Sequence, residues 1–229
     1  IPAFREELFR FVGSVIAEDR NVNDLMTGDW SFLNERLALH YGIKGVRGGE
    51  FRRVKLQDSA RKGLLGKGAL LMATSYANRT SPVVRGAYVL EHLMGTPPAA
   101  PPPGVSALPE SQEGGEQLTV RHRLEVHRKT KSCASCHAII DPVGLALENY
   151  NTLGQWRQKD IDAGVGIDSE GKLADGTVVK GVEALRDYIV ARPDLFVRTF
   201  TENLLTYSLG RSAQYYDKPL IRRIVRDSA

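Results

Sequence analysis

The stretch Cys133-Ala134-Ser135-Cys136-His137 organises the whole chain and contains both of its cysteines. Two cysteines three positions apart lie about one turn apart on a helix, so both thiols can reach one edge of a flat ligand. A histidine that follows directly can turn its imidazole onto a metal in that ligand. The pattern C-x-x-C-H is the attachment site of a c-type haem. We therefore predict a covalent haem c on Cys133 and Cys136, with His137 as the proximal ligand of the iron.

Two other interpretations of this motif stay open. A structural zinc site takes four ligands, and His127 and His137 together with the two cysteines would make a Cys2His2 set. A redox-active dithiol is typical of a βαβ context, whereas the residues around this motif predict helices. The immediate histidine and the helical surroundings favour haem over both.

Residues that follow the motif are expected to complete a haem pocket. A backbone carbonyl beside Pro142 is expected to accept the Nδ1 proton of His137, which would fix the tautomer of the ligand. Trp156 and Arg157 are candidates to bond a haem propionate, and Arg128 is a further one. The residues expected to cover the porphyrin face are apolar, namely Ile139, Ile140, Val143, Leu145 and Leu147.

The sixth ligand of the iron decides the chemistry, because two strong ligands make an electron carrier and an open position permits substrate binding. No methionine follows His137, so the downstream methionine of small cytochromes c is absent. The upstream candidates are Met26, Met72, Met94, His40, His92, His122 and His127. His127 shares an apolar stripe with Val120 and Leu124 and is the best histidine candidate. The alternative is a His127 that bonds a propionate or a backbone carbonyl.

Composition narrows the class of protein. The 229 residues are 42% hydrophobic and 25% charged, with a net charge of +4, as in an ordinary soluble globular protein. No Lys/Arg-rich block is present, so we predict no nucleic-acid partner, and no apolar run reaches the length of a membrane span. Because haem is attached covalently outside the bacterial cytoplasm, we expect a periplasmic or otherwise exported protein, with an export signal that preceded Ile1.

Hydrophobic periodicity predicts a mainly α fold. The ranges predicted as helices are 4–18, 32–41, 82–94, 118–128, 133–140, 145–150, 182–190, 193–209 and 217–226. Asp29 and Ser31 are candidate caps for the second of these helices, and Asp141 to Gly144 are expected to end the helix of the motif. An Asp-Gly pair predicts one small β hairpin within 164–181, a short strand is possible at 51–56, and the pattern leaves 64–74 undecided.

A proline-rich stretch divides the chain. Residues 97–103 read PPAAPPP, which predicts a stiff, extended strap. The polar segment 111–116 that follows is the best candidate boundary. We predict a helical N-terminal region at 1–110 that ends in the strap, and a c-type haem region with C-terminal helices at 111–229.

Four longer stretches resemble a known group. They read DWSFLNERLALHYGI (29–43), RKGLLGKGALLMATSYANRTSPVVRGAYVLEHLMGTPPAAPPPGV (61–105), HRKTKSCASCHAIIDPVGLALENYNTLGQWR (127–157) and PDLFVRTFTENLLTYSLGRSAQYYD (193–217). They are similar to the C-terminal part of the planctomycete-type cytochrome c multidomain proteins, although Ala77 replaces a proline of that pattern. The resemblance implies a haem c in an exported multidomain protein, bound by Cys133 and Cys136 and ligated by His137.

The sequence thus predicts a helical cytochrome c-like haem domain with a small β hairpin. Its expected function is electron transfer outside the cytoplasm, with a redox partner protein or a larger complex. The first alternative is a haem enzyme of peroxidase type with an open distal site, and the second is a structural or binding module stapled by haem. The coordination of the iron distinguishes an electron carrier from a haem enzyme, because a six-coordinate low-spin iron is typical of a carrier.

Overall fold

The computed structural model describes residues 1–100, 118–160 and 163–228. The fold is mainly α with two small two-stranded antiparallel sheets, which confirms the predicted fold class and adds one hairpin to it. None of the helices in these ranges is long and apolar enough to cross a membrane. The predicted boundary at 111–116 and the second part of the proline-rich strap, 101–103, lie outside the described residues, so the division into two regions stays a prediction.

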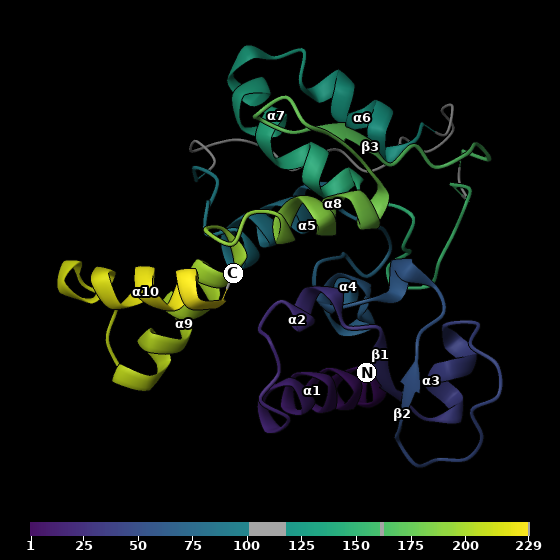
Figure 1. The fold of residues 1–229 in the computed structure, drawn as a ribbon. Helices are drawn as coiled ribbons and strands as arrows, with labels where there is room; N and C mark the ends of the chain where they lie inside the picture. Colours follow the sequence, from purple (N-terminus) through teal and green to yellow (C-terminus); the bar gives the residue numbers. More distant parts are fainter. Residues whose placement is uncertain (101–117, 161–162, 229) are drawn as a thin grey trace.

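The first half of the chain forms a helical layer that carries one hairpin (Figure 1). Its elements are α1 (Pro2–Ala17), α2 (Asp24–Thr27), β1 (Trp30–Leu33), α3 (Glu35–His40), β2 (Arg52–Lys55), the 3₁₀ turns η1 (Ser59–Arg61) and η2 (Leu64–Gly66), α4 (Gly68–Ala73), α5 (Pro82–Tyr88) and the π-helical turn η3 (Val89–Leu93). Strand β1 pairs with β2, and Trp30 lies opposite Lys55.

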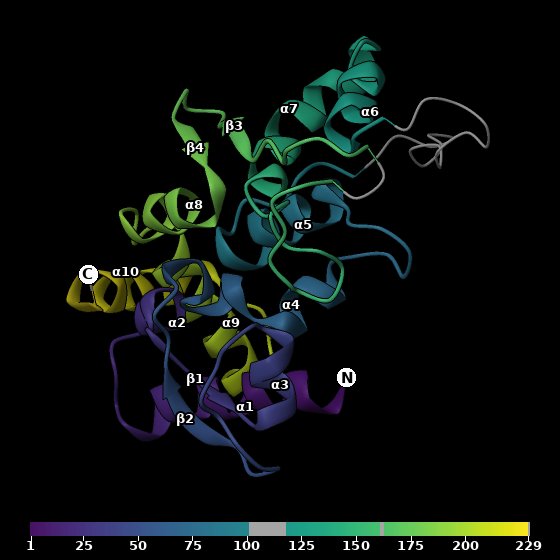
Figure 2. The ribbon, with the colours of Figure 1, turned by 90° about the vertical axis from the view of Figure 1, so that its right-hand side faces the viewer.

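The second half contributes a layer that packs on α5 and a helical hairpin at one side (Figures 1 and 2). Its elements are α6 (Val120–His127), α7 (Lys131–Leu145), β3 (Glu170–Lys172), β4 (Val178–Lys180), α8 (Gly181–Val190), α9 (Phe196–Leu209), the 3₁₀ turn η4 (Tyr215–Asp217) and α10 (Lys218–Ser228). Helix α6 lies beside α7, and β3 runs along α7.

Polar side chains begin several helices. The Ser81 hydroxyl accepts the N–H of Val84 at 3.2 Å, which caps α5 just ahead of Pro82. The Thr119 hydroxyl accepts the N–H of His122 at 3.1 Å and caps α6 in the same way. The undecided segment 64–74 is helical, with η2 leading into α4.

Three local predictions are wrong. The helix predicted at 32–41 begins at Glu35 with Asn34 as its cap, because Trp30–Leu33 pairs with β2 as a strand instead. The expected break at 141–144 does not occur, since α7 continues through Pro142 to Leu145. The segment 146–149 then forms turns and not the predicted short helix.

Close packing against α5 explains why α7 continues past its proline. A Cβ at Gly144 of α7 would collide with the carbonyl of Pro82, and a Cβ at Gly86 of α5 would collide with the carbonyl of Ile140. The two glycines therefore let the helix backbones approach each other closely. This contact replaces part of the stability that Pro142 removes by having no backbone N–H to donate.

A single large hydrophobic cluster holds the two halves of the chain together. It includes Phe11 of α1, Val89 of η3, Val143 of α7, Leu185 of α8 and Phe196 of α9. A smaller cluster around Leu33 and Leu37 fills the space between α1, α3 and the first hairpin. The main cluster thus takes members from both sides of the proline-rich strap.

Candidate haem-attachment site

The C-x-x-C-H motif occupies the first two turns of α7. The backbone N–H groups of Cys133 and Ala134 both bond the carbonyl of Thr130, the N-cap, at 3.0 Å, which fixes the start of the helix. Cys133, Cys136 and His137 are all half-buried, and Cys136 packs against the main hydrophobic cluster. One helix therefore carries two half-buried cysteines and an imidazole within two turns.

His137 is anchored by a carboxylate on the same helix. Its Nδ1 atom lies 2.8 Å from Oδ1 of Asp141, four residues further along α7. The side chain of His137 is 14% exposed, and that of Asp141 is fully buried. With Nδ1 engaged by the carboxylate, Nε2 is the nitrogen left for a metal.

The group predicted to bond Nδ1 of His137 is therefore not the one found. We expected a backbone carbonyl beside Pro142, and the structure provides the side chain of Asp141 instead. Residues four apart lie on the same face of a helix, so an unbroken α7 brings the two side chains together. Pro142 itself is buried, and its backbone lies so close to Gly171 of β3 that a Cβ there would collide with it.

Opposing effects act on the Asp141 carboxyl. Burial raises its pKa, and the hydrogen bond from His137 and the charge of Arg128 act against that rise. The Arg128 Nε atom lies 3.6 Å from Oδ2 of Asp141. Asp141 thus has a ring nitrogen at one oxygen and a guanidinium near the other.

His127, the favoured sixth-ligand candidate, contacts His137 directly. The two ring centroids are 4.8 Å apart, with the ring planes at 71°. Two axial nitrogens on opposite sides of one iron would each lie about 2 Å from it, so α6 and α7 would have to separate to place an iron between these rings. His127 as a ligand stays a prediction.

The other sixth-ligand candidates have contacts elsewhere in the fold. Met26 and Met94 are buried members of the main cluster, and Met72 packs on the smaller one. Nε2 of His40 lies 2.9 Å from the carbonyl of Leu153, and the ring of His92 lies 4.6 Å from that of Tyr88. His122 is exposed on α6. None of these contacts tests the ligand assignment.

Arg157 and Trp156 lie beyond the opposite end of α7 from the motif. Arg157 donates to Oε2 of Glu148 at 2.8 Å, and the Thr80 hydroxyl donates to the same oxygen at 2.9 Å. Trp156 is 42% exposed and packs edge-to-face on Tyr150, with centroids 5.2 Å apart. These contacts place both residues in a structural network, and their bond to a propionate stays a prediction.

Sequence reasoning missed the charged centre of that network. Arg85 of α5 is fully buried and donates to the carbonyls of Leu147, Tyr150 and Asn151 at 2.8–2.9 Å. Its Nη1 atom lies 3.6 Å from Oε1 of Glu148. Burial lowers the pKa of Arg85 to about 10 and raises that of Glu148, and each charge opposes the shift of the other. The only available signal was an arginine among apolar residues on a predicted helix.

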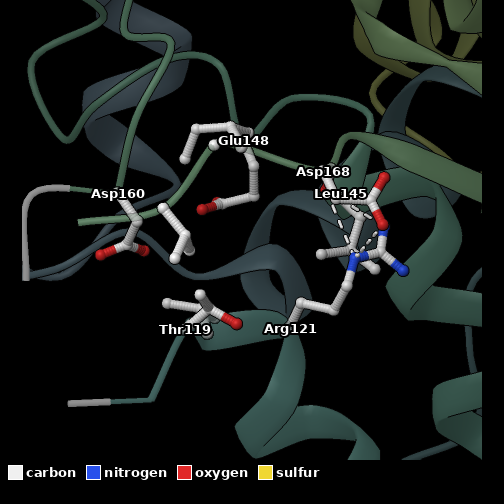
Figure 3. Close-up of a pocket in the computed structure, with 10 residues that line it drawn as sticks. Thr119, Arg121, Leu145, Glu148, Asp160 and Asp168 are labelled. Carbon is white, nitrogen blue, oxygen red and sulfur yellow. Dashed lines mark hydrogen bonds and ion pairs between the residues drawn. The ribbon is translucent and has the colours of Figure 1, made fainter. Parts of the chain in front are cut away.

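A small cavity lies at this same end of α7 (Figure 3). It has a volume of about 210 Å³ and is lined by Thr119, Arg121, Leu145, Glu148 and Asp160, among others. Arg121 pairs with Asp168 at 3.1 Å on one side, and the Glu148 carboxylate points into the space from another. Leu145 lies eight residues beyond His137, which is about 12 Å along a helix axis. The cavity and the motif are therefore separate features.

The residues of the motif fit a c-type haem. A haem iron brings four porphyrin nitrogens, so the protein has to supply only two thiols and an axial ligand, and α7 holds all three. Exposed apolar side chains are present on both neighbouring helices, with Val126 of α6 47% exposed and Ile139 of α7 45% exposed. In the described part of the chain, no group of three or more His, Cys, Asp or Glu could hold a metal ion, so the Cys2His2 zinc set is not assembled.

Comparison with known families covers most of the chain. Three family models match in succession, each described as a protein of unknown function: DUF1592 at residues 1–43, DUF1588 at 61–160 and DUF1585 at 175–229. These are families of the planctomycete cytochrome c architecture. The DUF1588 match contains the C-x-x-C-H motif together with Asp141 and Arg85.

The order of the matches agrees with the resemblance noted in the sequence. The families of the planctomycete cytochrome c architecture are uncharacterised, and they point to a redox role only in general terms. Searches of the curated proteins and of the solved structures found no match. The motif and its surroundings are therefore the features of this chain that bear on its function.

Proposed function

We propose that this chain is a c-type haem protein that transfers electrons outside the cytoplasm, as a module or subunit of a larger redox assembly. The observation that carries the proposal is the arrangement on α7 of two cysteines one turn apart and an imidazole whose Nδ1 is already engaged. When bound, the haem supplies a one-electron centre. Cys133 and Cys136 tether it, and His137 provides the proximal nitrogen.

The position of Arg128 gives no support to the enzyme alternative, and His127 stays open to either function. An enzyme of peroxidase type needs a polar group across the iron from the proximal histidine. Arg128 lies instead beside Asp141, which engages His137 from the proximal side. A c-type haem protein is expected to be exported, and a carrier has to pass its electron to another centre. We therefore expect a redox partner that also lies outside the cytoplasm.

The proposal is tested by producing the chain with an export signal in a bacterial host that matures c-type haem. We expect the purified protein to keep its haem on a denaturing gel and to show the reduced spectrum of a low-spin, six-coordinate cytochrome. The variant C133A/C136A should lose the covalent haem. Ser135→Ala changes the same turn of α7 without touching a thiol or the ligand, so it should retain the haem.

Two results would contradict the proposal. Purified wild-type protein that carries zinc and no covalent haem would overturn the haem assignment. A covalent haem whose high-spin spectrum shifts with cyanide or carbon monoxide would leave the cofactor in place and replace the carrier with an enzyme.

A further inference from the structure

Asp141 is the residue that most distinguishes this site from a haem pocket with a backbone acceptor. Its Oδ1 atom lies 2.8 Å from Nδ1 of His137, and its side chain is fully buried. A carboxylate is an acceptor-only group when ionised, and hydrogen bonds to it are shorter and stronger than those to a neutral carbonyl. His137 is therefore held by a stronger acceptor than the carbonyl that we expected from the sequence.

The place of Asp141 is set by the packing of α7 and by one neighbouring guanidinium. Its backbone lies inside α7, at the level where Gly86 of α5 packs closely against Ile140. The guanidinium of Arg128 approaches Oδ2 at 3.6 Å from the end of α6. Oδ1 faces the imidazole, whereas the buried Oδ2 accepts no hydrogen bond and has only the nearby charge of Arg128.

We propose that Asp141 is a positioning residue that holds the His137 ring by Nδ1, directs Nε2 to the iron and keeps the reduction potential of the haem low. The inference rests on the proposed haem function. Outer-shell partners of a ligating histidine fix its tautomer and increase its basicity as a ligand. A more basic ligand stabilises ferric iron over ferrous iron, because the ferric form carries the additional positive charge.

Burial strengthens this effect. A negative group in a low-dielectric interior acts on a nearby charge more strongly than it would in water. Asp141 has no exposed surface, so solvent does not screen its interaction with the axial ligand. Arg128 offsets part of the charge, but it lies at the oxygen that does not bond His137.

The test compares the midpoint potential of the haem-loaded wild-type chain with that of D141N and D141A. Asn keeps an acceptor oxygen and removes the charge, whereas Ala removes the acceptor as well. We expect both variants to have a higher potential, with a shift of at least tenfold in the ferric-to-ferrous equilibrium for D141N, or about 59 mV for one electron. D187N is the matched control, because it removes the same charge from an exposed position on α8 and should leave the potential unchanged.

Each outcome decides the inference. A D141N protein with covalent haem and the wild-type potential overturns the role of Asp141 and leaves the proposed function standing. Wild-type protein without covalent haem overturns both. If D141N binds no haem, the ¹⁵N spectrum of the histidine rings in the unloaded C133A/C136A chain decides. A His137 ring that carries its proton on Nδ1 in this chain, and loses that preference when D141N is added, supports the inference. A His137 ring whose spectrum is the same with and without D141N overturns it.

Discussion

At the scale of the residue, the buried amine of Lys67 lies among polar groups. Lys67 is 1% exposed and donates to the hydroxyl of Ser31 at 3.0 Å and to the carbonyl of Trp30 at 3.3 Å. Its Nζ atom lies 3.9 Å from Oε1 of Glu7, which is also buried. Glu7 in turn accepts short hydrogen bonds from Ser31 and Tyr41, both at 2.6 Å. This network ties α1 to the first hairpin.

Burial of Lys67 predicts a dependence of stability on pH. Desolvation lowers its pKa from 10.5 to about 8, and the charge of Glu7 opposes the shift. Between those values the unfolded chain binds a proton that the folded chain has released, so the free energy of unfolding rises with pH. For the wild type relative to K67M, we expect a gain of about 2 kcal/mol between about pH 7.5 and about pH 9.5, measured by urea denaturation.

The control for this prediction is K55M. Lys55 of β2 has a side chain that is 75% exposed, so its loss should leave the pH profile parallel to that of the wild type. If K67M and the wild type change stability with pH to the same extent, Lys67 does not carry the buried charge described here.

At the scale of the element, the contact between α5 and α7 depends on glycine. Gly86 and Gly144 lie where each helix meets a carbonyl of the other, so neither position has room for a side chain. The contact sets the direction of α7 and with it the place of the motif. It also orders the turn after α7, because Arg85 of α5 bonds three carbonyls in that turn.

We predict that Gly144→Ala destabilises the fold. The added methyl group would collide with the backbone of Pro82, and the helices would have to separate. Overpacking of this kind typically costs about 1–3 kcal/mol, seen as a lower denaturation midpoint. In a haem-loaded chain, we expect the site to be perturbed as well, because α7 carries both proposed tethers and the proposed ligand.

Gly13→Ala is the matched control for this prediction. Gly13 is an exposed helical glycine in α1, and a Cβ there meets no atom within 4 Å. Alanine lowers the entropy of the unfolded chain and favours helix, so it should stabilise the protein by about 0.5–1 kcal/mol. Equal effects of the two substitutions would show that the close α5–α7 contact is not present in solution.

At the scale of the whole molecule, one hydrophobic core joins the two halves of the chain. The main cluster contains Phe11 and Val89 from the first half with Val143 and Phe196 from the second. The buried hydroxyl of Tyr150 in the second half also donates to the carbonyl of Ala60 in the first half, at 2.6 Å. The predicted regions 1–110 and 111–229 therefore share a core, wherever their boundary lies.

A shared core predicts cooperative unfolding. We expect a single thermal transition in which the calorimetric enthalpy equals the van't Hoff enthalpy, since neither half can unfold without exposing the apolar surface of the other. Differential scanning calorimetry of the chain measures both values. Two separate transitions, or a folded fragment 1–110, would show that the halves are independent domains.

Local sequence patterns predicted most of the helices. Helices α1, α5 and α8 lie close to their expected positions, because an amphipathic repeat acts over one or two turns, and α5 also has Ser81 as its cap. The strand Trp30–Leu33 was missed, since its pairing with β2 depends on residues about twenty positions away. The same limit explains the prediction that α7 ends before Pro142, because the compensating contacts come from α5 and β3.

The sequence by itself determined the candidate cofactor and the fold class, because C-x-x-C-H and helical periodicity are local properties of the chain. Only the tertiary structure decided what surrounds the ligand. An unbroken α7 is needed to bring Asp141 onto the face of His137, and Arg128 reaches the carboxylate only because α6 lies beside α7. The burial that makes this carboxylate a strong partner arises from packing between elements distant in the chain, which no short stretch of sequence encodes.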